Sequence, residues 1–128
     1  MNDEEFLRAL EACTLEPEQF DHRGHLRAGY LVLGREKSFA RALERMAGLI
    51  RGFAEHHGRA GMYHETITVA WIAAIHERMT GSTQDGWEDF AARHPELFER
   101  GFLGRHYRPE TLASARAREV FVLERLSA

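Results

Sequence analysis

The sequence predicts an all-α protein, a single-domain helical bundle of five to six helices joined by short loops, over residues 1–128. Three observations indicate this. Only three of the 128 residues are proline, and strong helix formers such as alanine, leucine, arginine and glutamate recur throughout. Apolar residues repeat at spacings of three and four, and no segment alternates as a strand does. A chain of this length supports one hydrophobic core and is too short for two.

The first two helices are predicted from their capping residues. Asn2 is an expected N-cap, with Glu5 three residues later as its capping-box partner, and the helix is expected over 3–13. Asp21 is the expected N-cap of the second helix. That helix is expected to end at Gly34, because glycine readily adopts the left-handed conformation that closes a helix.

The later helices follow the same logic. Ser38 is expected to cap a long third helix, which the glycine-containing segment 58–61 interrupts. The segment 81–86 is the clearest predicted loop, and the last helix is expected to bury Val120 and Phe121. The remaining helices are expected over 63–79, 87–93 and 114–126.

Charge and composition exclude several classes of protein. Lys+Arg 17 and Asp+Glu 20 give a net charge of −3 with the signs interspersed, which argues against a nucleic-acid binder. No apolar run approaches the roughly 20 residues that cross a bilayer, so no membrane association is expected. The single cysteine, Cys13, excludes an internal disulfide and an all-thiolate zinc site. A reducing compartment, most simply the bacterial cytoplasm, is the expected location.

Eight histidines in so short a chain raise the question of a metal site. His22 and His25 stand three residues apart, so in a helix they share a face and can converge on one ion, at about 2.0–2.1 Å for zinc. Gly24 between them is expected to leave the local surface open. The alternative is a pair of solvated imidazoles in a first helical turn, one of which caps or hydrogen-bonds.

A second candidate group is His64 with Glu65. His64 falls on the same stripe as Ile67 and Trp71, so it is expected to face the core as a neutral imidazole, the form that binds metals. The alternative is a core histidine satisfied by a backbone carbonyl or by Thr68. Glu65 is interpreted as a fourth ligand, an anchor for an imidazole or a general base for bound water. Its alternative is a carboxylate that stabilises the helix dipole.

A third candidate is the pair His106 and Tyr107. The imidazole is a candidate third or fourth ligand, and the phenol a candidate hydrogen-bond donor to an oxyanion. The alternative is a loop histidine on the surface. The sequence contains no H-E-x-x-H, P-loop, dinucleotide-binding or G-x-S-x-G motif, so those chemistries have no support.

The two histidine motifs carry a resemblance. The chain resembles a group of small bacterial all-helical proteins with an F-x-H-x-x-H motif, here residues 20–25, and a Y-H-E-T-I-T motif, here residues 63–68. Further matching pieces lie at residues 94–97, 106–107 and 112–118. The resemblance implies a helical domain and supplies no reaction.

The preferred hypothesis is a metal-dependent enzyme that acts on a small molecule. Zinc, iron or copper would suit imidazole ligands, with hydrolysis, transfer or isomerisation for zinc and oxidative chemistry for iron or copper. The candidate metal ligands are His22, His25, His64 and His106, and the candidate catalytic residues are Glu65 and Tyr107.

Two other hypotheses stay open. The first is a metal-free helical binding or regulatory module whose histidines are buried hydrogen-bonding groups. The second is a metal-free acid/base enzyme that uses His64 and Glu65. The expected partner in each case is a small molecule. A homodimer is an open alternative, because Trp87 and Phe102 belong either to a dimer face or to the core.

Overall fold

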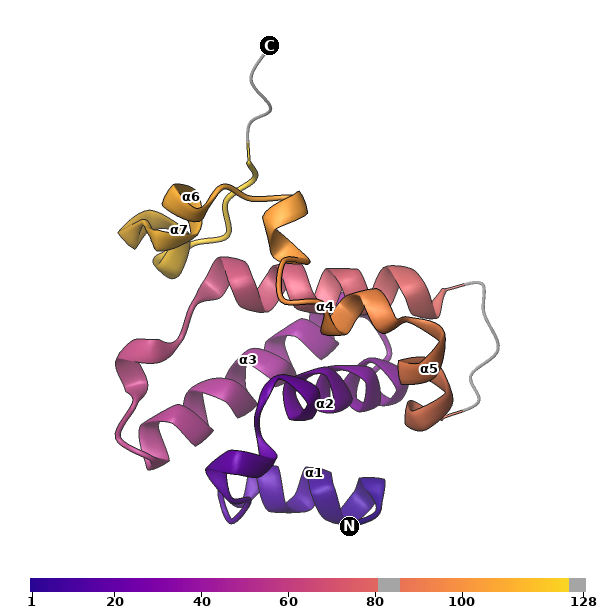
Figure 1. The fold of residues 1–128 in the computed structure, drawn as a ribbon. Coiled ribbons are helices and arrows are strands. Elements are labelled where there is room, and N and C mark those ends of the chain that lie inside the picture. Colours follow the sequence, from indigo (N-terminus) through magenta and orange to yellow (C-terminus); the bar gives the residue numbers. More distant parts are fainter. Residues whose placement is uncertain (81–85, 125–128) are drawn as a thin grey trace.

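A computed structural model describes residues 1–80 and 86–124, and over these residues the protein is all-α, with helices and no strand. This confirms the predicted fold class. The α-helices of these residues are labelled in chain order in Figure 1. They are α1 (Asp3–Glu11), α2 (His22–Arg35), α3 (Phe39–His56), α4 (Glu65–Met79), α5 (Trp87–Arg93), α6 (Pro109–Ala113) and α7 (Ala115–Glu119). Short 3₁₀ turns connect them: η1 (Pro17–Gln19), η2 (Ala60–Met62), η3 (Pro95–Phe98) and η4 (Leu103–Arg105).

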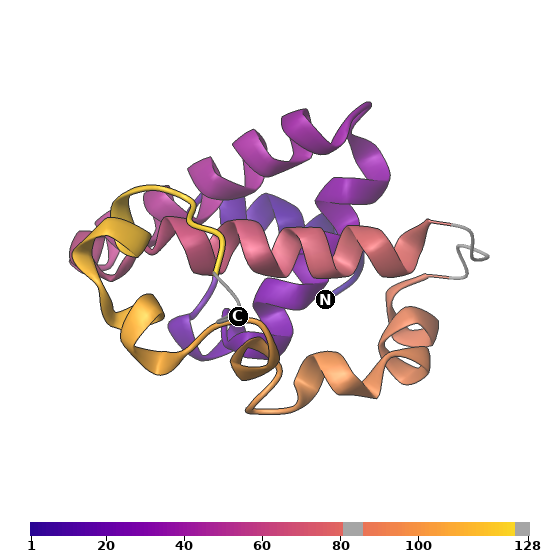
Figure 2. The ribbon, with the colours of Figure 1, turned by 90° about the horizontal axis from the view of Figure 1, so that it is seen from above.

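Helices α2, α3 and α4 pack against one another and form the centre of the molecule (Figures 1 and 2). Helix α1 packs on α3, α5 packs on α2, and α7 lies on α4. Gly29 of α2 packs closely against α4, and an added Cβ there would lie 2.9 Å from Cδ1 of Ile75 and 3.1 Å from Cδ1 of Ile72. A larger residue at position 29 would therefore force these isoleucine side chains to shift.

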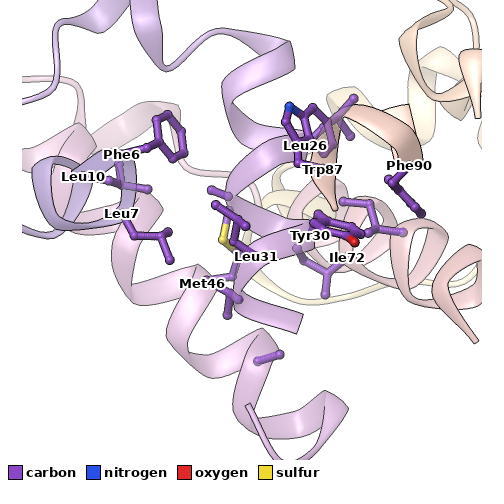
Figure 3. Packing of buried hydrophobic residues seen from close by; sticks show 14 of the residues in the cluster. Phe6, Leu7, Leu10, Leu26, Tyr30, Leu31, Met46, Ile72, Trp87 and Phe90 are labelled. Atoms are coloured by element: carbon purple, nitrogen blue, oxygen red, sulfur yellow. The ribbon is translucent and has the colours of Figure 1, made fainter. Parts of the chain in front are cut away.

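The core draws side chains from α1 through α5, as Figure 3 shows. Apolar burial at such positions is the main favourable term in folding. Trp87 and Phe102, the two aromatics considered for a dimer face, are only 4% and 2% exposed. Both belong to the core, so neither is available to a dimer interface.

The predicted helix starts are confirmed at three N-caps. Asn2 and Glu5 form the reciprocal capping box, and the Asp21 carboxylate and the Ser38 hydroxyl each accept a backbone N–H of the first turn. The predicted ends of the first two helices are wrong. Helix α1 ends at Glu11, and Cys13 takes the left-handed conformation that turns the chain, with φ of 59°.

Helix α2 continues one residue past Gly34 to Arg35, and Gly34 does not adopt a positive φ. The helix continues because the N–H of Glu36 still bonds to the carbonyl of Val32 at 3.0 Å. The Arg35 guanidinium also pairs with the Glu4 carboxylate of α1. A tertiary ion pair thus favours a helical Arg35 at the position where the sequence predicts a stop.

The end of the chain differs most from prediction. Of the predicted loop 81–86, residues 81–85 lie outside the described residues. The predicted helix over 114–126 ends at Glu119 instead, and Val120 and Phe121 are each 42% exposed rather than buried. Residues 125–126 of that predicted helix also lie outside the described part of the chain.

The physical reason is a set of side-chain hydrogen bonds that hold the following residues extended. The buried Thr66 hydroxyl of α4 donates to the Val120 carbonyl at 2.8 Å and accepts the Val122 N–H at 3.1 Å. The Tyr107 hydroxyl donates to the Val122 carbonyl at 2.7 Å. The Glu124 carboxylate accepts the Arg108 N–H at 2.8 Å. The backbone groups of Val120 and Val122 therefore form hydrogen bonds to side chains instead of the bonds that a longer helix would need.

None of the helices within residues 1–80 and 86–124 is both long enough and apolar enough to cross a bilayer.

Gly24 has a different role from the one its position predicts. It is buried rather than open to solvent, and a Cβ at this position would lie 2.4 Å from the carbonyl oxygen of Gln19. The chain before α2 therefore packs directly on the first turn of the helix, and only glycine permits this approach.

We predict that Gly24→Ala destabilises the protein by about 1–3 kcal/mol, the usual cost of an overpacked site, although alanine is the better helix former. Gly48→Ala in α3 is the matched control, because nothing lies within 4 Å of a Cβ built there. The control is expected to stabilise the protein by up to about 1 kcal/mol. Urea unfolding of both variants measures the difference. Equal effects at the two positions would contradict the close contact with Gln19.

Candidate functional site

A cavity of about 380 Å³ lies between α2, α3 and α4, and we call it the histidine pocket. That size is at the small end of the range for small-molecule sites. Its walls combine apolar side chains with the polar groups of three predicted site histidines. The residues that line it are Phe20, Asp21, His22, His25, Leu26, Met46, Ile50, Met62, Tyr63, His64, Ile67, Thr68, Trp71, Ile72 and Ile75. Helix α2 thus brings the first histidine motif to the start of α4, where the second motif lies.

His22 is the first residue of α2 and holds one ring nitrogen in a backbone hydrogen bond. Its Nε2 lies 2.9 Å from the Leu97 carbonyl of η3. A carbonyl can only accept, so Nε2 carries the proton and Nδ1 carries the lone pair of the neutral ring. The ring also meets Trp71 edge-on, with centroids 4.7 Å apart. His22 is thus fixed in one tautomer on the pocket wall.

His25 is fixed in the opposite tautomer. Its Nδ1 lies 2.8 Å from the Asp21 carbonyl and donates to it, so the lone pair is at Nε2. The ring stacks on Phe20 with centroids 3.8 Å apart and planes 13° apart. Burial lowers the pKa of His25 below its usual value, and the nearby His22 lowers it further, although the bond to Asp21 opposes the shift. His25 is therefore a neutral hydrogen-bond acceptor at pH 7.

His64 is the N-cap of α4, and both of its ring nitrogens are engaged. Nδ1 accepts the N–H of Ile67 at 3.1 Å, and Nε2 donates to the Leu112 carbonyl of α6 at 2.7 Å. The Thr68 hydroxyl donates to the His64 carbonyl at 2.8 Å. His64 is 7% exposed, as its place on the apolar stripe predicts. Its surroundings are those of the alternative interpretation, a core histidine satisfied by a backbone carbonyl.

Glu65 lies beside the histidine pocket but does not line it. Its Oε1 accepts the Tyr63 hydroxyl at 2.6 Å and lies 3.8 Å from the Arg51 guanidinium, which covers the Tyr63 ring at 4.3 Å. Burial, followed by the bond to Glu65, raises the pKa of Tyr63 to about 12, so the phenol stays protonated. The proposed acid/base role of Glu65 stays a prediction.

His106 and Tyr107 lie at a different cavity, one of about 410 Å³ that α4 lines with Ala70 and Ala73. The histidine pocket is lined by other residues of α4, so the helix separates the two cavities. The Tyr107 hydroxyl donates to the Val122 carbonyl at 2.7 Å, so the donor predicted to meet an oxyanion has a backbone partner. The structure does not bring His106 to the other three histidines.

Within residues 1–80 and 86–124, no three His, Cys, Asp or Glu side chains are arranged to hold one metal ion. Of the four proposed ligands, His22 and His25 share a pocket and each retains one ring nitrogen with a lone pair. His64 shares the pocket but has no nitrogen left, and His106 lies elsewhere. Metal binding therefore stays a hypothesis for two imidazoles.

Sequence reasoning missed the groups that complete the site. The carbonyl of Leu97, which accepts from His22, lies 75 residues away in the sequence, and that of Leu112, which accepts from His64, lies 48 residues away. No local sequence pattern predicts which backbone carbonyl will be the acceptor. Met62 of the pocket wall precedes the predicted helix, and Tyr63, its first predicted residue, was not proposed as a site residue. Tyr63 is adjacent to His64 in the Y-H-E-T-I-T motif, which is the one signal that pointed to it.

Comparisons with protein families, with curated proteins and with solved structures found no match to this chain.

We predict that the two nitrogens of His64 contribute separately to stability. His64→Ala removes the N-cap bond and the bond to Leu112, each worth about 1 kcal/mol, for an expected loss of about 2 kcal/mol. His64→Asn keeps a capping oxygen and loses the second bond alone, so about half of the loss is expected. Urea unfolding of the two variants checks this, and equal losses would contradict a capping role.

We also predict that the His25 pKa makes the protein less stable in mild acid. The unfolded chain binds a proton at His25 near pH 6.5, whereas the folded protein does so only at lower pH. The free energy of unfolding therefore falls as pH drops from about 6.5 to the folded pKa and is unaffected by His25 above pH 6.5.

His25→Phe keeps a ring on Phe20 and should reduce this slope, whereas His76→Phe, away from the pocket, should not. Urea unfolding between pH 5 and 8 measures the slope, and NMR titration measures the pKa directly. A His25 ring that titrates at or above pH 6.5 would refute the prediction.

Proposed function

We propose that this protein binds a small, largely apolar molecule in the histidine pocket without a metal ion. The observation that carries the proposal is a cavity of about 380 Å³ with apolar walls and two imidazoles, each fixed by a backbone carbonyl. This is the metal-free binding module among the hypotheses drawn from the sequence. A concave apolar site with a few convergent polar groups is the usual form of a small-molecule site.

The chemistry of the two imidazoles defines the ligand further. The Nδ1 of His22 and the Nε2 of His25 carry lone pairs, so each ring accepts a hydrogen bond through that atom. Among the described residues, Asp21 is the one carboxylate that lines the pocket, and it is already used as the N-cap of α2, where it accepts the Gly24 N–H at 2.9 Å. The preferred ligand therefore has an apolar body and a hydrogen-bond donor such as a hydroxyl.

A metal-dependent enzyme is the second candidate, and one observation favours it. In metal sites, a ligating histidine commonly donates its other ring N–H to a carbonyl or carboxylate, which is the arrangement of His22 and His25. Zinc, iron or copper would suit these ligands. Two imidazoles fall short of the three protein ligands of a typical catalytic zinc site, so we rank this proposal below metal-free binding.

We also propose a reducing compartment such as the bacterial cytoplasm as the location, because the chain has a single cysteine and so cannot form an internal disulfide.

We predict that phenol binds the histidine pocket with a dissociation constant of about 1 mM, equal to about −4.1 kcal/mol. Phenol supplies an apolar ring and one donor. Benzene lacks the donor and should bind about fivefold more weakly, the effect of one neutral hydrogen bond of about 1 kcal/mol. Titrations followed by amide and methyl NMR measure both affinities and locate the affected residues.

Two pairs of variants test the location. Ile67→Trp fills the histidine pocket and should abolish phenol binding, whereas Ala73→Trp, at the other cavity, should preserve it. His25→Phe should remove the preference for phenol over benzene, and His76→Phe should keep it. Phenol binding that survives Ile67→Trp, or no binding of either probe, would refute the proposal.

Alanine variants of His22 and His25 test the metal candidate. Zinc, iron(II) and copper(II) are titrated against protein purified without a histidine tag, with thermal unfolding as the readout. Zinc at 100 times its dissociation constant would stabilise the fold by about 2.7 kcal/mol. Loss of such a shift in both His22→Ala and His25→Ala, with retention in His76→Ala, would favour the metal site over metal-free binding.

A further inference from the structure

A second cavity, of about 290 Å³, adjoins the histidine pocket, and we call it the Arg59 pocket. The two cavities share the side chains of Phe20, His25, Ile50, Met62 and Tyr63. The Arg59 pocket adds residues from the end of α3 and the turn that follows, among them His57 and Arg59. Met62, on both walls, is 71% exposed and flexible, so a ligand can extend from one cavity into the other.

His57 lines this cavity and carries a buried polar atom without a partner in the described part of the chain. Its Nε2 is buried and has no hydrogen-bond partner among the described residues. Its ring packs on Phe53 with centroids 4.4 Å apart. An unpaired buried donor or acceptor costs about 1–3 kcal/mol, so such atoms are rare in folded proteins. A ligand atom in the Arg59 pocket would satisfy it if the His57 ring turned toward the cavity, because Nε2 is closed to solvent in the present rotamer.

The charge of this cavity is positive. Arg59 lines it and forms no ion pair within residues 1–80 and 86–124, and no acidic side chain lines it. Tyr63, which lines both cavities, donates a hydrogen bond from its hydroxyl to Glu65. That carboxylate also lies 3.8 Å from the Arg51 guanidinium, which offsets its charge.

The backbone explains why His57 and Arg59 share one cavity. Gly58 takes a left-handed φ of 69°. Its N–H bonds to the Glu55 carbonyl at 3.1 Å, and the Arg59 N–H bonds to the Ala54 carbonyl at 2.7 Å. This Schellman pattern ends α3 within one residue and requires glycine at the turn. The turn places the imidazole and the guanidinium on either side of Gly58.

We propose that the Arg59 pocket is a carboxylate subsite and that the ligand of the histidine pocket is a small apolar monocarboxylic acid. The inference rests on the proposed function, because the body of the acid occupies the histidine pocket. The Arg59 guanidinium donates to the carboxylate oxygens, which makes the hydrogen bonds charge-assisted and strong, and the His57 ring adds an Nε2–H donor when it turns toward the cavity. A dianion such as a phosphate monoester would bring a second charge that the single arginine leaves uncompensated.

The test extends phenol by a carboxylate arm. Binding of 3-(4-hydroxyphenyl)propanoate is compared by calorimetry and NMR with its neutral alcohol, 3-(4-hydroxyphenyl)propan-1-ol, and with 4-hydroxyphenethyl phosphate. We expect the carboxylate to bind at least about tenfold more tightly than the alcohol, the effect of one charge-assisted hydrogen bond, and more tightly than the phosphate.

Arg59→Ala and His57→Phe should each lower the affinity for the carboxylate towards that of the alcohol and leave the affinity for phenol unchanged. Arg59→Lys should restore part of the preference. Lys37→Ala, which removes an exposed charge between α2 and α3, is the control and should have no effect. His57→Phe should also raise the melting temperature of the free protein, because it removes the unsatisfied nitrogen without removing the packing on Phe53.

The outcomes separate the two proposals. If phenol binds the histidine pocket but the carboxylate binds no more tightly than the alcohol, the subsite is refuted and the proposed function stands. A carboxylate preference that persists in both Arg59→Ala and His57→Phe refutes it as well, and tighter binding of the phosphate refutes the monocarboxylate class. If phenol and the carboxylate both fail to bind, the proposed function itself is refuted.

Discussion

The position of α4 depends on the His64 imidazole, which joins two parts of the chain through its two nitrogens. Nδ1 satisfies a backbone N–H at the start of α4, and Nε2 donates to the Leu112 carbonyl of α6. Two residues later, Thr66 bonds to the extended segment after α7. The first turn of α4 thus holds the C-terminal part of the molecule in place (Figure 1). Since α4 also forms a wall of the histidine pocket, the same contacts set the shape of that cavity.

Backbone carbonyls, rather than acidic side chains, determine the chemistry of the pocket histidines. The N–H groups of His22 and His25 point to the carbonyls of Leu97 and Asp21. A carbonyl fixes the tautomer without adding a negative charge that would favour protonation of the ring. Burial can then lower the pKa of His25, and the result is a pair of imidazoles that each present a lone pair to an apolar cavity. Such a pair suits a ligand with a donor group or a metal ion, and it does not suit an anion.

How much of this could be predicted depends on how local each interaction is. The caps at Asn2, Asp21 and Ser38 involve atoms three residues apart, so the sequence predicts them and the structure confirms them. The predicted helix ends at Met79 and Arg93 are also confirmed. The predicted end of α2 failed, and there the helix continues to Arg35, which pairs with the distant Glu4. The last helix failed for the same reason, because Thr66 binds a backbone 54 residues away.

The features of the site were also predictable only where they depend on local geometry. Periodicity predicted that His64 faces the core, and the side chain is buried, but His64 is the extended N-cap before α4 and not a residue of the helical face itself. It did not reveal that both nitrogens would be engaged, since Ile67 supplies one partner locally and Leu112 supplies the other from across the fold. Nor did it separate His106 from the other histidines, because only the tertiary fold sets α4 between the two cavities.

Within residues 1–80 and 86–124, one buried polar atom, Nε2 of His57, lacks the hydrogen-bond partner that other buried polar groups of this protein have. Thr66, Tyr107 and His64 each place a buried or half-buried polar atom against a backbone partner, whereas His57 Nε2 has none within the described part of the chain. A core that only had to be stable would favour an apolar side chain at position 57. A protein retains a destabilising polar group where function requires it, and here that group belongs to a residue that lines a cavity with an arginine and, among the described residues, no carboxylate. The imidazole acceptors of one cavity and the arginine of the next therefore describe a single ligand with a donor at one end and a negative charge at the other.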